Sequence, residues 1–389
     1  SKKHNKSMNT KIRATAVFLF ALLLATSCGS SRKSGNTDNS VKDTVEIKYA
    51  KGFDISSYEH YKKITVYNLS EQGRTQQTIY LVDNKDVATP DDGLKIVVPI
   101  GKIAVASVTY YGFLAELGEL ETVKGVCSPD IAYNKYITDG YKSGAIANLG
   151  DSFSPDLEKL VVLHPDIFML PSYQQQDEMI KRLQNAGIPF VFNNEWMETS
   201  PLARTEWIKF VAAFYNKSAE ADSIFDQIES RYLEAKKTAA SATDKPTVLM
   251  NANFKGTWYM PGGKSYVANL VADAGGDYFY KNDTTVGSLA LSFETVLKNF
   301  NSADVWLNVP VGSMAELLAM EQRHNLFKPT KTGNVFSFMG RYLPSSANDY
   351  WETALVEPDV VLKDIIWALH PSLLPDYKPV YIQKVAISK

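Results

Sequence analysis

The chain has 389 residues, of which 45% are apolar and 22% charged, and its formal net charge is -2. This length exceeds one typical domain core, so two lobes are expected in a soluble globular protein. The charge balance provides no basic surface of the kind that binds nucleic acid. The 21 Tyr, 18 Phe and 6 Trp residues either fill cores or offer flat faces to a large ligand.

Residues 1–27 have the layout of an export signal. We predict that translation starts at Met8, so that Lys11 and Arg13 form a basic region ahead of the apolar run over residues 16–25. That run is too short to span a bilayer and has signal-peptide length. Cys28 directly follows small residues, which resembles a bacterial lipobox and predicts a lipidated first residue. The alternative is an ordinary secretory signal that is cleaved elsewhere.

Residues 28–44 are predicted to be a flexible tether, because the segment after Cys28 is rich in serine, glycine and asparagine. Cys127 is the other of two cysteines, so a lipidated Cys28 would leave it without a disulfide partner. No acidic cluster follows Cys28 in the tether. This pattern favours a periplasmic protein that is lipid-anchored to a membrane, with the inner membrane preferred.

Residues 45–98 are predicted to form a β-rich extension packed on the first lobe. The segments 62–68 and 76–83 are rich in β-branched and aromatic residues, and turn signals such as the proline and glycine of residues 90–93 separate the strands. The sequence alone assigns this extension no role.

Residues 99–199 are predicted to form an N-terminal α/β lobe. Ser154 is placed to cap a helix, and Pro155 suits its first turn because the missing N–H would be unpaired there. Strands and helices alternate at short spacing, which indicates a parallel sheet; the expected elements are 102–108, 112–120, 123–127, 154–163, 166–170, 174–187 and 189–193.

A long helical segment is predicted over residues 200–240, because it has no proline after Pro201 and no glycine. About 40 helical residues would extend on the order of 60 Å, although residues 216–218 weakly interrupt the pattern. An α/β pattern resumes over residues 241–389. The predicted fold class is therefore α/β, with two Rossmann-like lobes joined by a long linking α-helix and an N-terminal β-rich extension.

Enzyme motifs are missing where the sequence first suggests them. The "PGGKS" of residues 261–265 resembles part of a phosphate-binding loop, but Trp258 occupies the position where that motif needs a glycine. No hydrolase, zinc-protease or dinucleotide signature occurs. His164 and His370 precede prolines at predicted helix ends, and no Cys/His cluster indicates a metal site.

Two segments repeat one pattern: "SPDLEKLVVLHPD" at 154–166 and "LSFETVLKNFNSADV" at 291–305. With the lipoprotein signal and the long helix, they resemble the substrate-binding proteins of iron-siderophore, haem and cobalamin ABC importers, over roughly residue 102 to the C-terminus. Residues 254–278 and 369–384 resemble the Bacteroidetes branch of that family. The resemblance implies a monomeric, non-catalytic receptor without a cofactor. Its partners would be a metal-chelate ligand and a permease dimer with its ATPase.

The resemblance also implies that each lobe offers one glutamate to the permease. Glu158 and Glu294 match those positions by their place in the two repeated segments. Two separated charge pairs would set orientation and encounter rate more than affinity. Without the resemblance, a glutamate in the first turn of a helix simply complements the helix dipole.

The ligand cleft is expected between the lobes, in loops at the carboxyl ends of strands. Aromatic residues there would stack on a flat chelate or macrocycle, while Lys255 and Arg341 would attract carboxylate or catecholate oxygens. Trp258 and Arg341 stand out because both lie in polar, glycine-flanked loops. The predicted ligand-binding residues are Thr109, Tyr110, Asp130, Tyr133, Ser152, Tyr173, Phe254, Lys255, Trp258, Arg341 and Tyr342.

Three other functions remain open from the sequence. A receptor for a bare metal ion would use a histidine cluster, and an enzyme acting on tetrapyrroles or metals would need an acid/base pair in the cleft. A lipoprotein scaffold would have no small-molecule cleft. For the receptor, the long linking helix predicts that the lobes move little when ligand binds.

Overall fold

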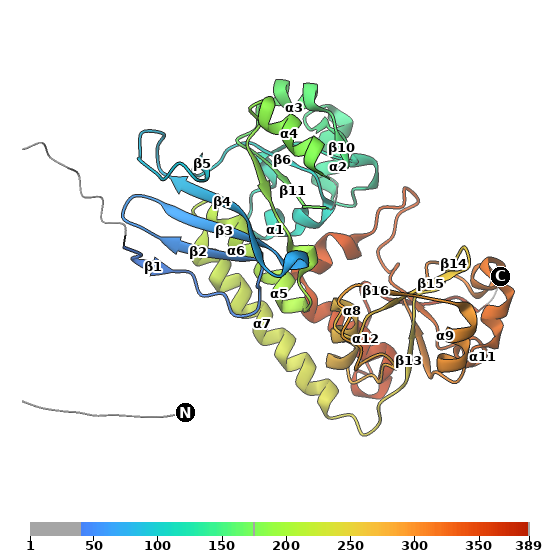
Figure 1. The fold of residues 1–389 in the computed structure, drawn as a ribbon. Coiled ribbons are helices and arrows are strands. Elements are labelled where there is room, and N and C mark those ends of the chain that lie inside the picture. Colours follow the sequence, from blue (N-terminus) through green and yellow to red (C-terminus); the bar gives the residue numbers. More distant parts are fainter. Residues whose placement is uncertain (1–39, 174–175, 388–389) are drawn as a thin grey trace, which may run out of the picture. The chain divides into compact units, whose positions relative to one another are not determined.

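The computed structural model describes residues 40–173 and 176–387. The predicted export signal, Cys28 and nearly all of the predicted tether lie outside these residues. In the described part, the chain forms an N-terminal β-sheet and two α/β lobes with helices between them (Figure 1). No helix of this part is long and apolar enough to cross a bilayer.

The first lobe is built on a five-stranded sheet in which all neighbouring strands are parallel. Its order is β12-β11-β6-β7-β8, so the chain leaves the central strand β6 first in one direction and later in the other. The carboxyl ends of β6 and β11 therefore border the switch point where open α/β sheets bind ligands. The strands are β6 (Ile103–Val105), β7 (Val123–Val126), β8 (Ala147–Asn148), β11 (Ile167–Leu170) and β12 (Phe190–Phe192).

Short helices connect these strands. All four residues of β11 are buried, as expected for a strand covered on both faces. The prediction that Ser154 caps the helix of the first repeated segment is wrong, because Ser154 and Pro155 pair as a short strand. Asp156 is the cap and accepts a hydrogen bond from the amide of Lys159 at 3.0 Å. The helices are α1 (Tyr111–Glu116), α2 (Lys135–Ser143), α3 (Leu157–Leu163) and α4 (Asp177–Asn185).

The second lobe has a more divided sheet than the predicted Rossmann-like pattern. Its parallel pair is β13 with β17, and single bridges extend this pair at Thr247–Asp277 and Trp306–Val335. A separate antiparallel sheet holds β14, β15 and β16, and β18 pairs with β19. The strands are β13 (Val248–Met250), β14 (Asn253–Phe254), β15 (Thr257–Pro261), β16 (Ser288–Leu291), β17 (Val305–Leu307), β18 (Phe336–Ser337) and β19 (Gln383–Lys384).

Helices of the second lobe follow its strands. Ser313 begins one of them with a capping box, in which its hydroxyl accepts from the amide of Glu316 while the Glu316 side chain accepts from the amide of Ser313. The helices are α8 (Tyr266–Asp273), α9 (Phe293–Phe300), α10 (Met314–Met320), α11 (Lys328–Thr332) and α12 (Pro358–Leu369).

The segment predicted as one helix over 200–240 is divided into α5 (Pro201–Glu206), α6 (Ile208–Ala213) and α7 (Ser218–Ala240). The amide of Lys217 bonds back to the carbonyl of Ala212, and Asn216 takes a left-handed conformation with φ 56°. This is the usual way to end a helix. The long helix is therefore α7 alone, with 23 residues and a length of about 35 Å (Figure 1).

Two neighbouring glutamines of β4, Gln76 and Gln77, bond the N-terminal sheet to the first lobe. Gln77 of β4 donates from its side chain to the carbonyl of Phe190 at 2.8 Å and accepts from the amide of Phe192 at 2.9 Å. It thereby satisfies part of the edge of β12 as another strand would. The strands, in sheet order, are β1 (Asp43–Thr44), β2 (Phe53–Ser57), β3 (Lys62–Asn68), β4 (Arg74–Val82) and β5 (Leu94–Val97).

A buried carboxylate holds the start of this sheet against the helices. Glu206 of α5 accepts hydrogen bonds from the amides of Lys48, Tyr49 and Ala50 at 2.7 to 2.8 Å. The side chains of Lys48 and Tyr49 also reach Glu229 on α7. The extension is thus bonded to the helical segment as well as to β12.

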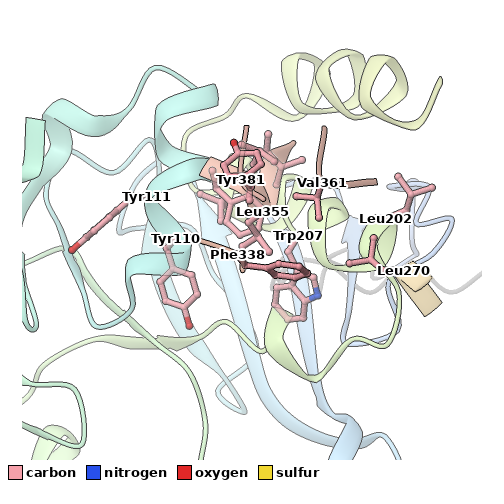
Figure 2. Packing of buried hydrophobic residues seen from close by; sticks show 14 of the residues in the cluster. Tyr110, Tyr111, Leu202, Trp207, Leu270, Phe338, Leu355, Val361 and Tyr381 are labelled. Carbon is pink, nitrogen blue, oxygen red and sulfur yellow. The ribbon is translucent and has the colours of Figure 1, made fainter. Parts of the chain in front are cut away.

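One hydrophobic core crosses from the helical segment into the second lobe. Figure 2 shows some of its buried side chains: Leu202 of α5, Trp207, Leu270 of α8, Val361 of α12, and Leu355, which precedes α12. Helix α12 also packs along α7. Because the helical segment and the second lobe share this core, the connection between the lobes is packed and is not an exposed hinge.

Candidate ligand site between the lobes

A cavity of about 600 Å³ lies between the lobes, and we refer to it as the interlobe cavity. Its volume suits a ligand of several hundred daltons. The first lobe and the extension contribute one side, and the second lobe contributes the other. The lining residues are Leu69, Ser70, Trp196, Met197, Glu198, Asn251, Pro261, Ser265, Tyr266, Val267, Val286, Gly287, Ser288 and Asn308.

Two asparagines place this cavity at the carboxyl ends of the parallel strands of the second lobe. Asn251 follows β13 and Asn308 follows β17, and both have left-handed backbones with φ near 60°. Asparagine tolerates this conformation better than most residues. Their side chains are bonded to each other, with Nδ2 of Asn308 donating to Oδ1 of Asn251 at 2.8 Å.

Three aromatic rings form a row on the first lobe. The ring of Tyr173 lies 4.8 Å from that of Phe153 and 5.9 Å from that of Trp196, measured between centroids. Tyr173 follows β11 and Trp196 follows β12, while Phe153 lies in the turn between the two-residue strands β9 (Gly150–Asp151) and β10 (Ser154–Pro155). Phe153 and Trp196 are 65% and 42% exposed, so their faces are open to a flat ligand.

A buried ion pair beside the interlobe cavity joins the first lobe to α5. Oε2 of Glu195 accepts from Nε and Nη2 of Arg204 at 2.8 and 2.7 Å, and both side chains are largely buried. The guanidinium also lies 4.8 Å from the ring centre of Tyr266, which lines the cavity from the second lobe. The charge of Arg204 is thus already balanced by a carboxylate of the protein.

Glu198 ties the extension to the cavity wall. Its Oε1 accepts from the amides of Lys51 and Gly52 and from Nε1 of Trp207, at 2.8 to 3.0 Å. Burial raises the pKa of Glu198, and these three donors oppose that rise. The extension therefore supplies bonds to a residue of the candidate site.

Two of the predicted ligand-binding residues are core residues, so the prediction that they line the cleft is wrong. Trp258 is fully buried, stacks on Trp306 and donates from Nε1 to the carbonyl of Met250 at 2.8 Å. Alternation along β15 turns Trp258 inward and leaves Tyr259 exposed. Tyr110 is also fully buried, and its hydroxyl donates to the carbonyl of Asn193.

The other predicted residues are spread over several places. Tyr173 belongs to the aromatic row. Oγ1 of Thr109 bonds to the hydroxyl of Ser107 at the end of β6, Ser152 is partly exposed in the β9–β10 turn beside Phe153, and Asp130 is exposed.

Near Asp130, the amide of Tyr133 donates to a carboxylate oxygen of Glu352. This contact joins the first lobe to the segment that precedes α12.

The two basic candidates do not line the interlobe cavity. Phe254 ends β14 and Lys255 begins the exposed turn to β15, with the Lys255 ammonium 5.1 Å from the Phe254 ring centre. Arg341 is paired with Asp349 at 2.9 Å, and Tyr342 beside it is 41% exposed. Two cavity residues that were not predicted, Asn251 and Asn308, share one signal, because each directly follows a buried strand.

Glu158 and Glu294 occupy equivalent positions in the first turns of α3 and α9, and both side chains are exposed. Glu294 lies 3.2 Å from Nη1 of Arg323, which also pairs with Glu321. The structure thus places one acidic residue on each lobe, as the repeated segments predict.

The chain belongs to the periplasmic binding protein family, whose sequence profile matches residues 103–337. This is a family of solute-binding proteins and not of enzymes. An uncharacterized lipoprotein of Methanocaldococcus jannaschii is 28% identical over 97% of both chains. A second uncharacterized lipoprotein of that organism is 24% identical over 84% of this chain and 83% of its own.

Solved structures of similar fold include an ABC transporter substrate-binding protein from Listeria monocytogenes, with 21% identity and a TM-score of 0.52 over 70% of this chain and 99% of that one. A periplasmic haem-binding protein from Pseudomonas aeruginosa has 15% identity and a TM-score of 0.56 over 75% and 99%. Helicobacter pylori CeuE with Ni(II) bound has 16% identity and a TM-score of 0.56 over 75% and 91%. These similarities confirm the two-lobe α/β fold.

Proposed function

We propose that the protein is the substrate-binding component of an ABC importer and captures a metal chelate or metal macrocycle, such as an iron-siderophore, haem or a cobalamin-like compound. The observation that carries the proposal is the interlobe cavity with the aromatic row Phe153, Tyr173 and Trp196 beside it. Broad aromatic faces favour a large ligand over a bare metal ion. Among the described residues, no group of three or more His, Cys, Asp or Glu is placed to hold a metal ion.

Titration of the purified full-length protein in mild detergent tests ligand capture. Haem, cobalamin and ferric siderophores are added separately, and quenching of intrinsic tryptophan fluorescence is measured. Trp196→Ala should weaken binding of the active ligand by about tenfold, because a stacking face is lost. Phe279→Ala is the matched control, since Phe279 is an exposed aromatic outside the interlobe cavity. The proposal fails if no compound binds, or if both variants weaken binding equally.

Glu158 and Glu294 are proposed to dock the two lobes on the two subunits of a permease dimer that works with an ATPase. Their exposure on equivalent helices supports this role. Changing both to alanine should leave the fluorescence titration intact and abolish ligand uptake by cells. Normal uptake by the double variant would reject the docking role.

We also propose that the protein acts as a monomer on the periplasmic face of the inner membrane, anchored by lipid on Cys28. The relatives described as lipoproteins support an anchor. Cys28→Ser should release the protein from membrane fractions and prevent its labelling by radioactive palmitate. Unchanged labelling of the variant would place the lipid elsewhere.

A further inference from the structure

The interlobe cavity contains a hydrogen-bond acceptor whose orientation follows from its neighbours. The carbonyl of Tyr259 can only accept, so Asn251 must turn its Nδ2 toward that oxygen, at 2.7 Å. Oδ1 of Asn251 then faces Asn308 and accepts from its Nδ2 at 2.8 Å. The side-chain amide of Asn308 has one further polar atom, Oδ1, which has no donor among the described residues. Asn308 lines the cavity.

A second acceptor belongs to Glu198, whose side chain is only 4% exposed and also lines the cavity. All three of its protein donors, the amides of Lys51 and Gly52 and the indole of Trp207, reach the same atom, Oε1. Oε2 has no donor among the described residues. Oε2 is not one of the fully enclosed side-chain atoms that lack a partner, and Glu198 lines the cavity, so a ligand donor can reach this oxygen.

The charges around the cavity favour the same kind of ligand. None of the described residues that line it is Lys, Arg or His. Arg204, next to Tyr266, is held by Glu195. An anionic ligand group would therefore meet two acceptors without a balancing cation, whereas a donor group would satisfy both acceptors.

From this geometry we infer that the ligand presents hydrogen-bond donors to Asn308 and Glu198, namely primary amides, hydroxyls or an ammonium group, and not carboxylates or catecholate oxygens. The inference rests on the proposed function, because it concerns the ligand of the same cavity. It differs from the expectation that Lys255 and Arg341 attract ligand anions, since those residues lie outside the cavity lining.

Matched ligand pairs test the inference on the full-length protein at 150 mM salt, a concentration on the order of the physiological value. Each pair shares one scaffold: a corrinoid with peripheral primary amides or the same corrinoid hydrolysed to carboxylates, haem as its diamide or with free propionates, and a ferric trihydroxamate ending in an ammonium group or N-succinylated. The donor-bearing member should bind about tenfold more tightly. Equal or tighter binding of the carboxylate members would overturn the inference while the proposed function stands. Absence of binding by every compound would overturn both.

Two variants assign the preference to these atoms. In Glu198→Gln the three donors hold the amide oxygen at the position of Oε1, so the amide nitrogen replaces Oε2 and a cavity acceptor becomes a donor. Asn308→Gly removes the other acceptor, and glycine accepts φ of 61°. Each variant should reduce the donor preference to less than about threefold.

Asn216→Gly is the matched control, because Asn216 is an exposed asparagine with φ of 56° before α7. It should keep the full donor preference. Thermal unfolding confirms that each variant is folded. A full preference in both folded cavity variants would overturn the inference, and so would its loss in the control.

Discussion

Glu352 should make the folded protein less stable as the pH rises. Its carboxylate is 2% exposed and accepts hydrogen bonds from the amides of Tyr133 and Asn134, at 2.6 and 2.8 Å, which join the segment before α12 to the first lobe. Burial raises the pKa of Glu352 to about 7, while the two amide donors oppose the rise and nearby Asp349 adds to it. Burial is the largest of these effects.

The size and sign of the effect follow from proton linkage. Between the ordinary pKa of 4.5 and a pKa of about 7, the folded state binds more protons at Glu352 than the unfolded state does. Stability from this group is therefore complete below pH 4.5 and falls as the pH rises to 7. At about 1.4 kcal/mol per pKa unit, the loss is about 3 kcal/mol.

The assay compares wild type with Glu352→Gln by urea unfolding at about pH 4 and about pH 8, below the ordinary pKa and above the raised one. Other titrating groups cancel in the difference between the two proteins. Relative to the variant, wild type should lose about 3 kcal/mol of unfolding free energy between the two pH values. A difference that does not change with pH would show that the Tyr133 and Asn134 amides offset burial, and one that favours wild type at high pH would show that they outweigh it. Either result would refute the reasoning.

Two further predictions concern residues outside the interlobe cavity. Trp258→Phe should lower the unfolding free energy by about 2 kcal/mol, because it leaves a gap and removes the hydrogen bond to Met250, and should change ligand affinity by less than about twofold. Chemical denaturation measures the first effect and the fluorescence titration the second. A large loss of affinity would show that Trp258 contacts the ligand. In Glu206→Gln, the side-chain NH2 would face a backbone N–H of residues 48–50, so that this N–H loses its acceptor. The change should lower the unfolding free energy by about 2 kcal/mol and make residues 45–52 accessible to limited proteolysis. A cleavage pattern identical to that of wild type would show that Glu206 does not hold the extension.

Loop composition was a poor guide to which side chains face the cleft, because it cannot separate a loop from a short buried strand. Tyr173 was predicted because it follows a buried strand, and the structure places it beside Phe153 and Trp196. The docking role of Glu158 and Glu294, predicted from their repeated segments, stays a prediction. Trp258 was misplaced because glycine-flanked residues look like a loop. In the structure it belongs to β15, whose alternation buries it.

The sequence by itself determined the local elements and the α/β class, because periodicity, helix caps and turn residues act over a few neighbouring positions. It predicted a helix in each repeated segment, although it placed the first cap at Ser154, two residues before the observed cap Asp156. The sequence also indicated an interruption at residues 216–218, and the structure shows that it is a full break, where the left-handed Asn216 separates α6 from α7.

The tertiary structure also decided what faces the interlobe cavity. Trp196 and Glu198 are far in sequence from Asn251 and from Asn308, and these residues become neighbours only through strand order and lobe packing. The charge available at the site has the same origin, because Arg204 is balanced by Glu195 only after both are buried together. Long-range packing has no signature in a single sequence, so the chemistry of this cavity could be derived only from the fold.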